Sequence, residues 1–286
     1  MLSANIKFKT FKKIKKIKKI KNILIKLLSE QNQVLDSLGS SYKYSYHNRY
    51  LTKFKNSSNI RIIGMGGSTL GAQAIYDFLK YKIKKKFIFI DNLISSQKKT
   101  NKKFTNIIIS KSGNTTETIV NANILIKKKD KNIFITEDKP SYLNLLASKL
   151  RADIIHHNNF IGGRYSVLSE VGMLPAELMG LNPKKFKQLN FLIKKKSFTN
   201  SLISSVSATL YFIQKKKYNS IIINYDEKSE NLFKWYQQLV AESLGKKNSG
   251  ILPVVSIMPR DNHSVMQLYL DGFKNNFFTF FHVNDN

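Results

Sequence analysis

The chain contains no cysteine among its 286 residues. This absence excludes a disulfide framework, a thiolate nucleophile and any zinc or iron–sulfur centre that uses cysteine ligands. It also fits a reducing compartment, so we expect a cytoplasmic protein. No run of about 18 consecutive apolar residues occurs either, and the sequence therefore predicts no membrane-spanning helix.

Arginine and acidic residues are scarce. The chain has 48 Lys and Arg residues against 18 Asp and Glu, a formal net charge of +30, and only five of the basic residues are Arg. A guanidinium group binds phosphate or guanine through two parallel hydrogen bonds, whereas a lysine ammonium is a compact, strongly hydrated charge. The composition therefore predicts a general attraction for small anions and no nucleic-acid partner. A basic nucleic-acid binder is the alternative, and it would need Arg and aromatic residues along one strip.

Residues 11–28 combine Ile and Leu at helical spacing with Lys in most of the intervening positions. This pattern predicts a basic amphipathic helix. We expect its apolar stripe to pack on the rest of the chain, without stable membrane association. A helix lying on a membrane surface is the alternative.

Short apolar strands alternate with amphipathic helical segments from residue 61 onward. The strands are predicted at residues 62–63, 87–90, 107–109, 133–135 and 154–155, and in a second set at 221–223, 253–258 and 277–281. Such alternation is typical of an α/β fold whose mostly parallel sheet is covered on both faces. Residues 164–216 are predicted to be chiefly helical, with breaks at Pro175 and Pro183.

A glycine-rich loop, Gly64-Met65-Gly66-Gly67-Ser68, lies between the first predicted strand and a helix over residues 70–80. Glycine permits positive φ and close approach of the backbone to a ligand, and the start of the helix directs free N–H groups at the same place. The loop is therefore a candidate anion site, although a tight strand–helix turn would have the same composition. It matches neither a Walker loop nor the usual dinucleotide spacing.

A second loop, residues 110–116, also joins a strand to a helix and carries four hydroxyl groups and one ammonium group. Hydroxyl-rich loops at a helix N-terminus suit a phosphate monoester, which offers several acceptor oxygens. Glu117, in the first turn, is interpreted as a capping or dipole partner. If both loops lie at one sheet edge, they form a single phosphate pocket. The predicted phosphate-binding residues are Gly67, Ser68, Ser110, Lys111, Ser112 and Thr115.

Five segments together resemble the phosphoglucose isomerase family, whose fold is the sugar isomerase (SIS) fold. They are the two loops above, residues 162–166, residues 235–246, and residues 260–264 together with Gln267. The resemblance implies two SIS-type, flavodoxin-like parallel-sheet domains, the second incomplete. We expect an N-terminal helical segment and connection over 1–54, a first SIS domain with the phosphate loops over 55–195, and a second, truncated SIS domain over 196–286.

Three charged residues are candidates for the chemistry. On the sequence alone, Arg164 could stabilise an oxyanion or make a helix-start contact, Glu242 could be a partly desolvated base or a solvent-facing helical residue, and His263 could be functional or a cap. The resemblance implies that Arg164 stabilises an enediolate, that Glu242 transfers a proton between C2 and C1, and that His263 helps open the sugar ring. It also implies a homodimer with shared active sites.

The implied activity is interconversion of glucose 6-phosphate and fructose 6-phosphate, a reaction of glycolysis and gluconeogenesis, without a metal or organic cofactor. The family carries a catalytic Lys near its C-terminus, and no Lys follows Lys274 here. We therefore expect this chain to be a fragment or a shortened form. A non-catalytic SIS module that binds a phosphosugar, or an inactive fragment of the isomerase, are the alternatives.

Overall fold

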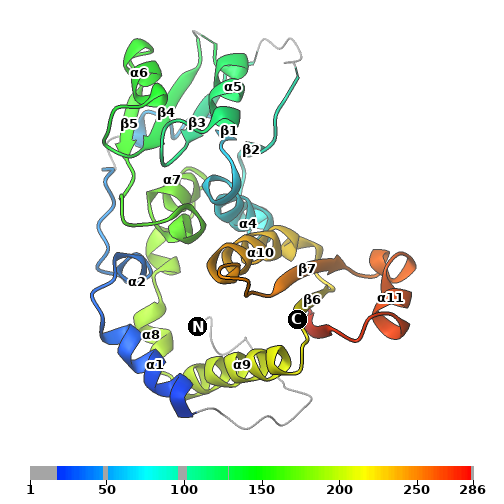
Figure 1. Cartoon of the computed structure of the whole chain (residues 1–286). Coiled ribbons are helices and arrows are strands. Elements are labelled where there is room, and N and C mark those ends of the chain that lie inside the picture. Colours follow the sequence, from blue (N-terminus) through cyan, green and yellow to red (C-terminus); the bar gives the residue numbers. More distant parts are fainter. Residues whose placement is uncertain (1–17, 48–50, 96–101, 128, 285–286) are drawn as a thin grey trace. The chain divides into compact units, whose positions relative to one another are not determined.

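The computed structural model describes residues 18–47, 51–95, 102–127 and 129–284 (Figure 1). The chain divides into two compact units. The five-stranded unit comprises Tyr42–Phe186 and Lys228–Leu239, and the three-stranded unit comprises Met1–Ser41, Lys187–Glu227 and Val240–Asn286. Each unit is described by itself.

The five-stranded unit is built on one parallel sheet with the order β2-β1-β3-β4-β5. The strand β2 pairs with one side of β1, and β3 pairs with the other side, so the direction in which strands are added reverses between β1 and β3. An open parallel sheet typically binds ligands at such a switch point. The strands predicted from their apolar runs are confirmed: β1 Asn59–Ile63, β2 Lys86–Ile90, β3 Thr105–Ile109, β4 Lys131–Thr136 and β5 Asp153–His156.

Helices cover both faces of this sheet, as Figure 1 shows. On one face α4 (Leu70–Phe78) and α7 (Glu170–Leu178) pack with the alternate residues Ile107 and Ile109 of β3. On the other face α5 (Thr116–Leu125) and α6 (Tyr142–Lys149) pack with Ile108. Because both faces are buried, the central strands need continuous apolar sequence.

The predicted helix break at Pro175 is wrong, because Pro175 lies inside α7. A proline in a helix loses one backbone hydrogen bond and crowds the carbonyl four residues before it. Nearly all of α7 is buried, and packing of this buried helix outweighs the local cost. The break predicted at Pro183 is confirmed, since α7 ends at Leu178 and a short 3-10 helix, Pro183–Phe186, follows.

The three-stranded unit has a parallel sheet with the order β7-β6-β8. Its strands confirm the second predicted set: β6 Asn219–Asn224, β7 Leu252–Ile257 and β8 Asn276–Phe281. Phe212 stacks on Phe277 of β8 with ring centroids 5.2 Å apart. The helices of this unit are α1 Lys18–Ser29, α2 Gln33–Asp36, α8 Leu189–Ile193, α9 Lys196–Gln214 and α11 Met266–Asp271, and α10, Glu230–Leu244, begins in the five-stranded unit and ends here.

The N-terminal amphipathic pattern forms helix α1, which packs against α9. Ile20, Leu24 and Leu28 are half-buried, as expected for a packed stripe, whereas Ile23 is 56% exposed. Residues 11–17 of the pattern lie outside the described residues. Within the part of the chain that the structure describes, no helix combines the length and apolar character needed to cross a membrane.

Candidate functional site

The glycine-rich loop and the hydroxyl-rich loop leave neighbouring strands at the same edge of the five-stranded sheet. Ile63 of β1 pairs with Ile108 of β3, so both strands end at the same level. A methyl group on Gly64 would lie 2.8 Å from the Ile109 carbonyl oxygen and 2.9 Å from the Cβ of Ser68. Gly64 thus lies close to both the end of β3 and Ser68, and the condition for a single phosphate pocket, that both loops lie at one sheet edge, is met.

The first loop turns into helix α4 through a single 3-10 turn, Gly66–Ser68. Gly66 has a φ of +53°, a conformation that favours glycine. Thr69 precedes α4, and its hydroxyl donates to the Gly66 carbonyl instead of capping the helix. The N–H groups of the first helical turn thus have no side-chain cap, which is the arrangement that binds an anion.

The second loop gathers its hydroxyl groups before helix α5. The Ser110 hydroxyl lies 2.8 Å from that of Thr115 and 3.5 Å from that of Ser112. Ser112 Oγ also accepts a hydrogen bond from the Asn114 N–H, and Gly113, with a φ of +68°, makes the turn. Thr115 does not cap α5 with its side chain. This loop therefore offers hydroxyl and N–H donors together.

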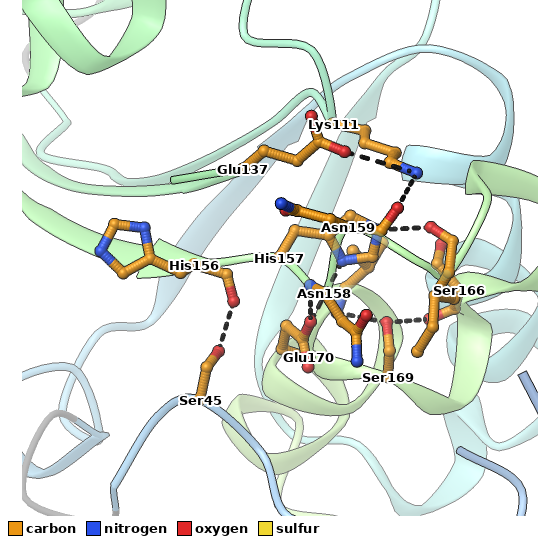
Figure 2. Close-up of polar contacts among 12 residues, drawn as sticks. Ser45, Lys111, Glu137, His156, His157, Asn158, Asn159, Ser166, Ser169 and Glu170 are labelled. Carbon is orange, nitrogen blue, oxygen red and sulfur yellow. Dashed lines mark hydrogen bonds and ion pairs between the residues drawn. The ribbon is translucent and has the colours of Figure 1, made fainter. Parts of the chain in front are cut away.

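Lys111 is held by the protein on both sides, as Figure 2 shows. Its Nζ donates to the Asn159 carbonyl oxygen at 2.7 Å and lies 3.4 Å from Oε1 of the buried Glu137. Lys139 pairs with the second oxygen of that carboxylate. Burial alone would raise the pKa of Glu137, but the two ammonium groups outweigh burial and hold the pKa below its usual range. The Lys111 side chain therefore has one N–H group left for a ligand.

The backbone of Arg164 packs against Gly67 of the first loop. A methyl group on Gly67 would overlap the Gly163 carbonyl group and approach the Arg164 nitrogen to 2.7 Å. The Arg164 carbonyl accepts a hydrogen bond from the Trp235 indole at 2.9 Å, and the guanidinium carbon lies 4.5 Å from the centre of the Tyr165 ring. Only glycine at position 67 permits this approach.

Gln238 is a site residue that the sequence motifs did not single out. Its side-chain nitrogen would lie 2.8 Å from a methyl group on Gly66. Its side-chain oxygen is buried and has no hydrogen-bond partner among the described residues. Gln238 belongs to the segment 235–246, which the resemblance includes, but its contact with the loop depends on the fold.

Glu242 and His263 belong to the three-stranded unit and are described with it. Glu242 lies in the last turn of α10 and is exposed, which agrees with the solvent-facing alternative and not with a partly desolvated carboxylate. His263 ends a 3-10 turn, Arg260–His263, that follows β7, and it is also exposed.

Asp261 lies in the same 3-10 turn as His263, two residues before it. Its carboxylate accepts the Ile257 N–H at 2.8 Å and the Arg260 Nε–H at 3.1 Å. Burial alone would raise the pKa of Asp261, and these hydrogen bonds hold it below its usual range. Among the described residues no hydrogen bond joins this carboxylate to the imidazole.

The described ranges contain no group of three or more His, Asp or Glu side chains placed to hold a metal ion. The donors at this edge of the five-stranded sheet are hydroxyl groups, backbone N–H groups, the Gln238 amide and the Lys111 ammonium group. Such a set recognises an anionic oxygen group.

Comparisons with known proteins agree with this chemistry. The sequence model of phosphoglucose isomerase matches residues 26–253. A glucose-6-phosphate isomerase from Methanocaldococcus jannaschii is 34% identical over 268 residues, which cover 86% of this chain and 66% of that protein. The chain thus spans about two-thirds of the length of the curated relatives it matches.

Solved structures support the fold. A glucose-6-phosphate isomerase from Chlamydia trachomatis superposes with a TM-score of 0.63 at 19% identity, covering 87% of this chain and 52% of that one. A hypothetical protein from Thermus thermophilus superposes with a TM-score of 0.67 at 21% identity, covering 92% of this chain and 69% of that one. The predicted class, parallel-sheet units of the sugar isomerase type, is confirmed.

Replacing Gly67 with Ala tests the packing of Arg164 on the first loop. The added methyl group has no room against Gly163 and must push the two segments apart, so inorganic phosphate should bind at least about tenfold more weakly by calorimetry. Gly163→Ala is the matched control, because a methyl group there meets nothing within 4 Å. Equal phosphate affinities for the two variants would contradict this geometry.

The Lys111–Glu137–Lys139 cluster predicts a pH dependence of stability. A carboxyl group whose pKa falls on folding stabilises the folded chain above its unfolded pKa, and this stabilisation is lost as pH falls through the folded pKa. Above pH 4.5, the ordinary pKa of a Glu carboxyl group, the wild-type chain should therefore have a larger free energy of unfolding than Glu137→Gln. This difference should shrink in more acidic buffer. Urea melts across this range measure it, with the exposed neighbour Asp138→Asn as control. A difference that is constant with pH would refute the assignment.

Proposed function

Because this chain belongs to the phosphoglucose isomerase family, we propose that it acts as an aldose–ketose isomerase that interconverts glucose 6-phosphate and fructose 6-phosphate. One observation carries the proposal. Two uncapped helix N-termini with hydroxyl-bearing loops meet at the switch point between β1 and β3, with the backbone of Arg164 packed on the first loop. Such a site fits the phosphate of a small sugar.

The phosphate group would bind to the backbone at Gly67 and to Ser68, Ser110, Ser112 and Thr115, with Lys111 completing the set. The side-chain amide of Gln238, beside Gly66, supplies a further donor for the sugar. The phosphate does not react. Its binding energy fixes the position of C1 and C2, which converts an encounter into an oriented reaction.

Glu242 would take the proton from C2 of the open-chain aldose and return it to C1 through a cis-enediol. The oxygen at C2 becomes the ketone and the oxygen at C1 becomes a hydroxyl, so the product is an isomer of the substrate. Arg164 keeps its charge at any working pH and would stabilise the enediolate. Because the hydrogen stays within one molecule, we expect no redox cofactor.

His263 would help to open the sugar ring. Following the family resemblance, we propose a homodimer in which His263 of one copy completes the active site of the other. The proposed compartment is the cytoplasm, which agrees with the absence of cysteine.

Replacing Glu242 with Gln tests the proposed chemistry. The amide has nearly the same shape but cannot accept the C2 proton, so turnover of glucose 6-phosphate to fructose 6-phosphate should fall by about a hundredfold to ten-thousandfold. Binding of glucose 6-phosphate, measured separately by calorimetry, should be retained because the phosphate loops are untouched.

Glu230→Gln is the matched control on the same helix, since Glu230 pairs with Lys234 at the surface. It should leave turnover unchanged. Retained turnover in Glu242→Gln would remove Glu242 from its role. Tight phosphosugar binding without turnover in the wild-type chain would instead favour a non-catalytic phosphosugar-binding module.

A further inference from the structure

A buried, hydrogen-bonded pair of His157 and Glu170 lies beside the segment that leads to Arg164. His157 and Glu170 are 3% and 1% exposed, and His157 Nδ1 lies 3.1 Å from Glu170 Oε1 (Figure 2). The other ring nitrogen, Nε2, lies 3.0 Å from the Ile161 carbonyl oxygen. A carbonyl oxygen only accepts hydrogen bonds, so Nε2 carries a hydrogen and the ring closes the turn over residues 157–161.

Glu170 gathers donors from separate parts of the chain. Its Oε1 accepts the Asn158 N–H at 2.8 Å in addition to the His157 contact, and its Oε2 accepts the Tyr42 hydroxyl at 3.0 Å. Burial alone would raise the pKa of Glu170, but the hydrogen bonds from His157 and Asn158 hold it below its usual range. Glu170 thus fixes both the side chain and the backbone at the start of the turn.

The rest of the segment is attached at two further places. Lys111, which follows Ser110 in the second phosphate loop, donates to the Asn159 carbonyl oxygen. Ser166 Oγ donates to the Gly163 carbonyl oxygen at 2.7 Å, and Ser169 Oγ donates to the Ser166 carbonyl oxygen at 2.7 Å. Figure 2 shows Lys111 and Asn159 together near Glu137, and Ser169 beside Glu170 at the start of α7.

From this arrangement we infer that Glu170 and His157 are positioning residues that set the place of Arg164 against the first phosphate loop. Arg164 follows the turn by three residues, and its backbone contacts Gly67. The inference rests on the proposed function insofar as it concerns catalysis. Well-packed apolar residues often stabilise a fold as well as a buried polar pair does, and in some proteins such a pair instead selects one conformation.

The experiment replaces His157 with Phe, which keeps an aromatic ring of similar size and removes both ring hydrogen bonds. Amide hydrogen exchange at residues 158–166 should become about tenfold faster or more, while β3 and β4 keep their protection. Glu170→Gln is the second variant, and either variant that folds is sufficient. His156→Phe is the matched control, because His156 is exposed and its ring pairs only loosely with Asp138 at 3.7 Å.

Tyr42→Phe is a third variant, because it removes the hydroxyl that donates to Glu170 Oε2 and that also contacts Asn158 at the start of the segment. It leaves the His157 contacts in place, so exchange at residues 158–166 should rise less than in His157→Phe. Unchanged exchange in folded His157→Phe or Glu170→Gln would overturn the inference, whatever the activity does.

Isomerase kinetics of the same variants give the second readout. Because a displaced Arg164 weakens stabilisation of the enediolate, kcat should fall about tenfold to a hundredfold, with a small change in KM. Faster exchange with unchanged kcat would overturn the link to Arg164. Faster exchange together with no turnover in the wild-type chain would count against the proposed function and would leave the positioning of the segment supported.

Discussion

The pairing of β1 with β3 brings two helix-preceding loops to the same level of one sheet edge, and the rest of the candidate site depends on this pairing. Ile63, the last residue of β1, lies opposite Ile108, and β3 ends one residue later at Ile109, so the two loops begin within one residue of the same level. The space between them is small: a side chain on Gly64 would meet the carbonyl of Ile109, and one on Gly67 would meet Gly163. Glycine at these positions lets the backbone segments approach one another closely at the edge where we propose that the phosphate binds.

The candidate site differs from the chain as a whole in how it attracts anions. The net charge of +30 attracts anions in general, whereas the site offers oriented, neutral hydroxyl and N–H donors. The Lys111 ammonium group forms an ion pair with Glu137 and donates a hydrogen bond to the Asn159 carbonyl oxygen. Donors that are fixed before the ligand arrives need no reorganisation, which favours recognition of a phosphate over mere attraction. The buried pair His157–Glu170 extends the same principle to the segment that carries Arg164.

Much of this could be predicted from sequence, because the signals are local. Apolar runs of strand length predicted the strands and their parallel arrangement, and the glycine- and hydroxyl-rich segments between them marked the two candidate loops. Contacts between distant segments could not be predicted. The interpretation of Pro175 as a break failed because burial of α7 outweighs the local effect of proline. Gln238 beside Gly66, Glu137 beside Lys111 and Glu170 beneath the turn leave no pattern in the sequence, since each depends on tertiary packing. The exposure of Glu242 could not be decided from the sequence either, since a helical Glu beside apolar neighbours fits both a solvent-facing and a partly desolvated carboxylate.

The central claim is that the phosphate of a hexose phosphate binds between residues 64–69 and 110–116. Backbone amide chemical shifts measured during a titration with glucose 6-phosphate test it most directly. We expect the largest, saturable changes at the amides of these two loops and of the first turns of α4 and α5. Changes confined to the exposed lysines elsewhere, such as Lys84, Lys86 and Lys103, or changes that grow without saturation, would contradict the account.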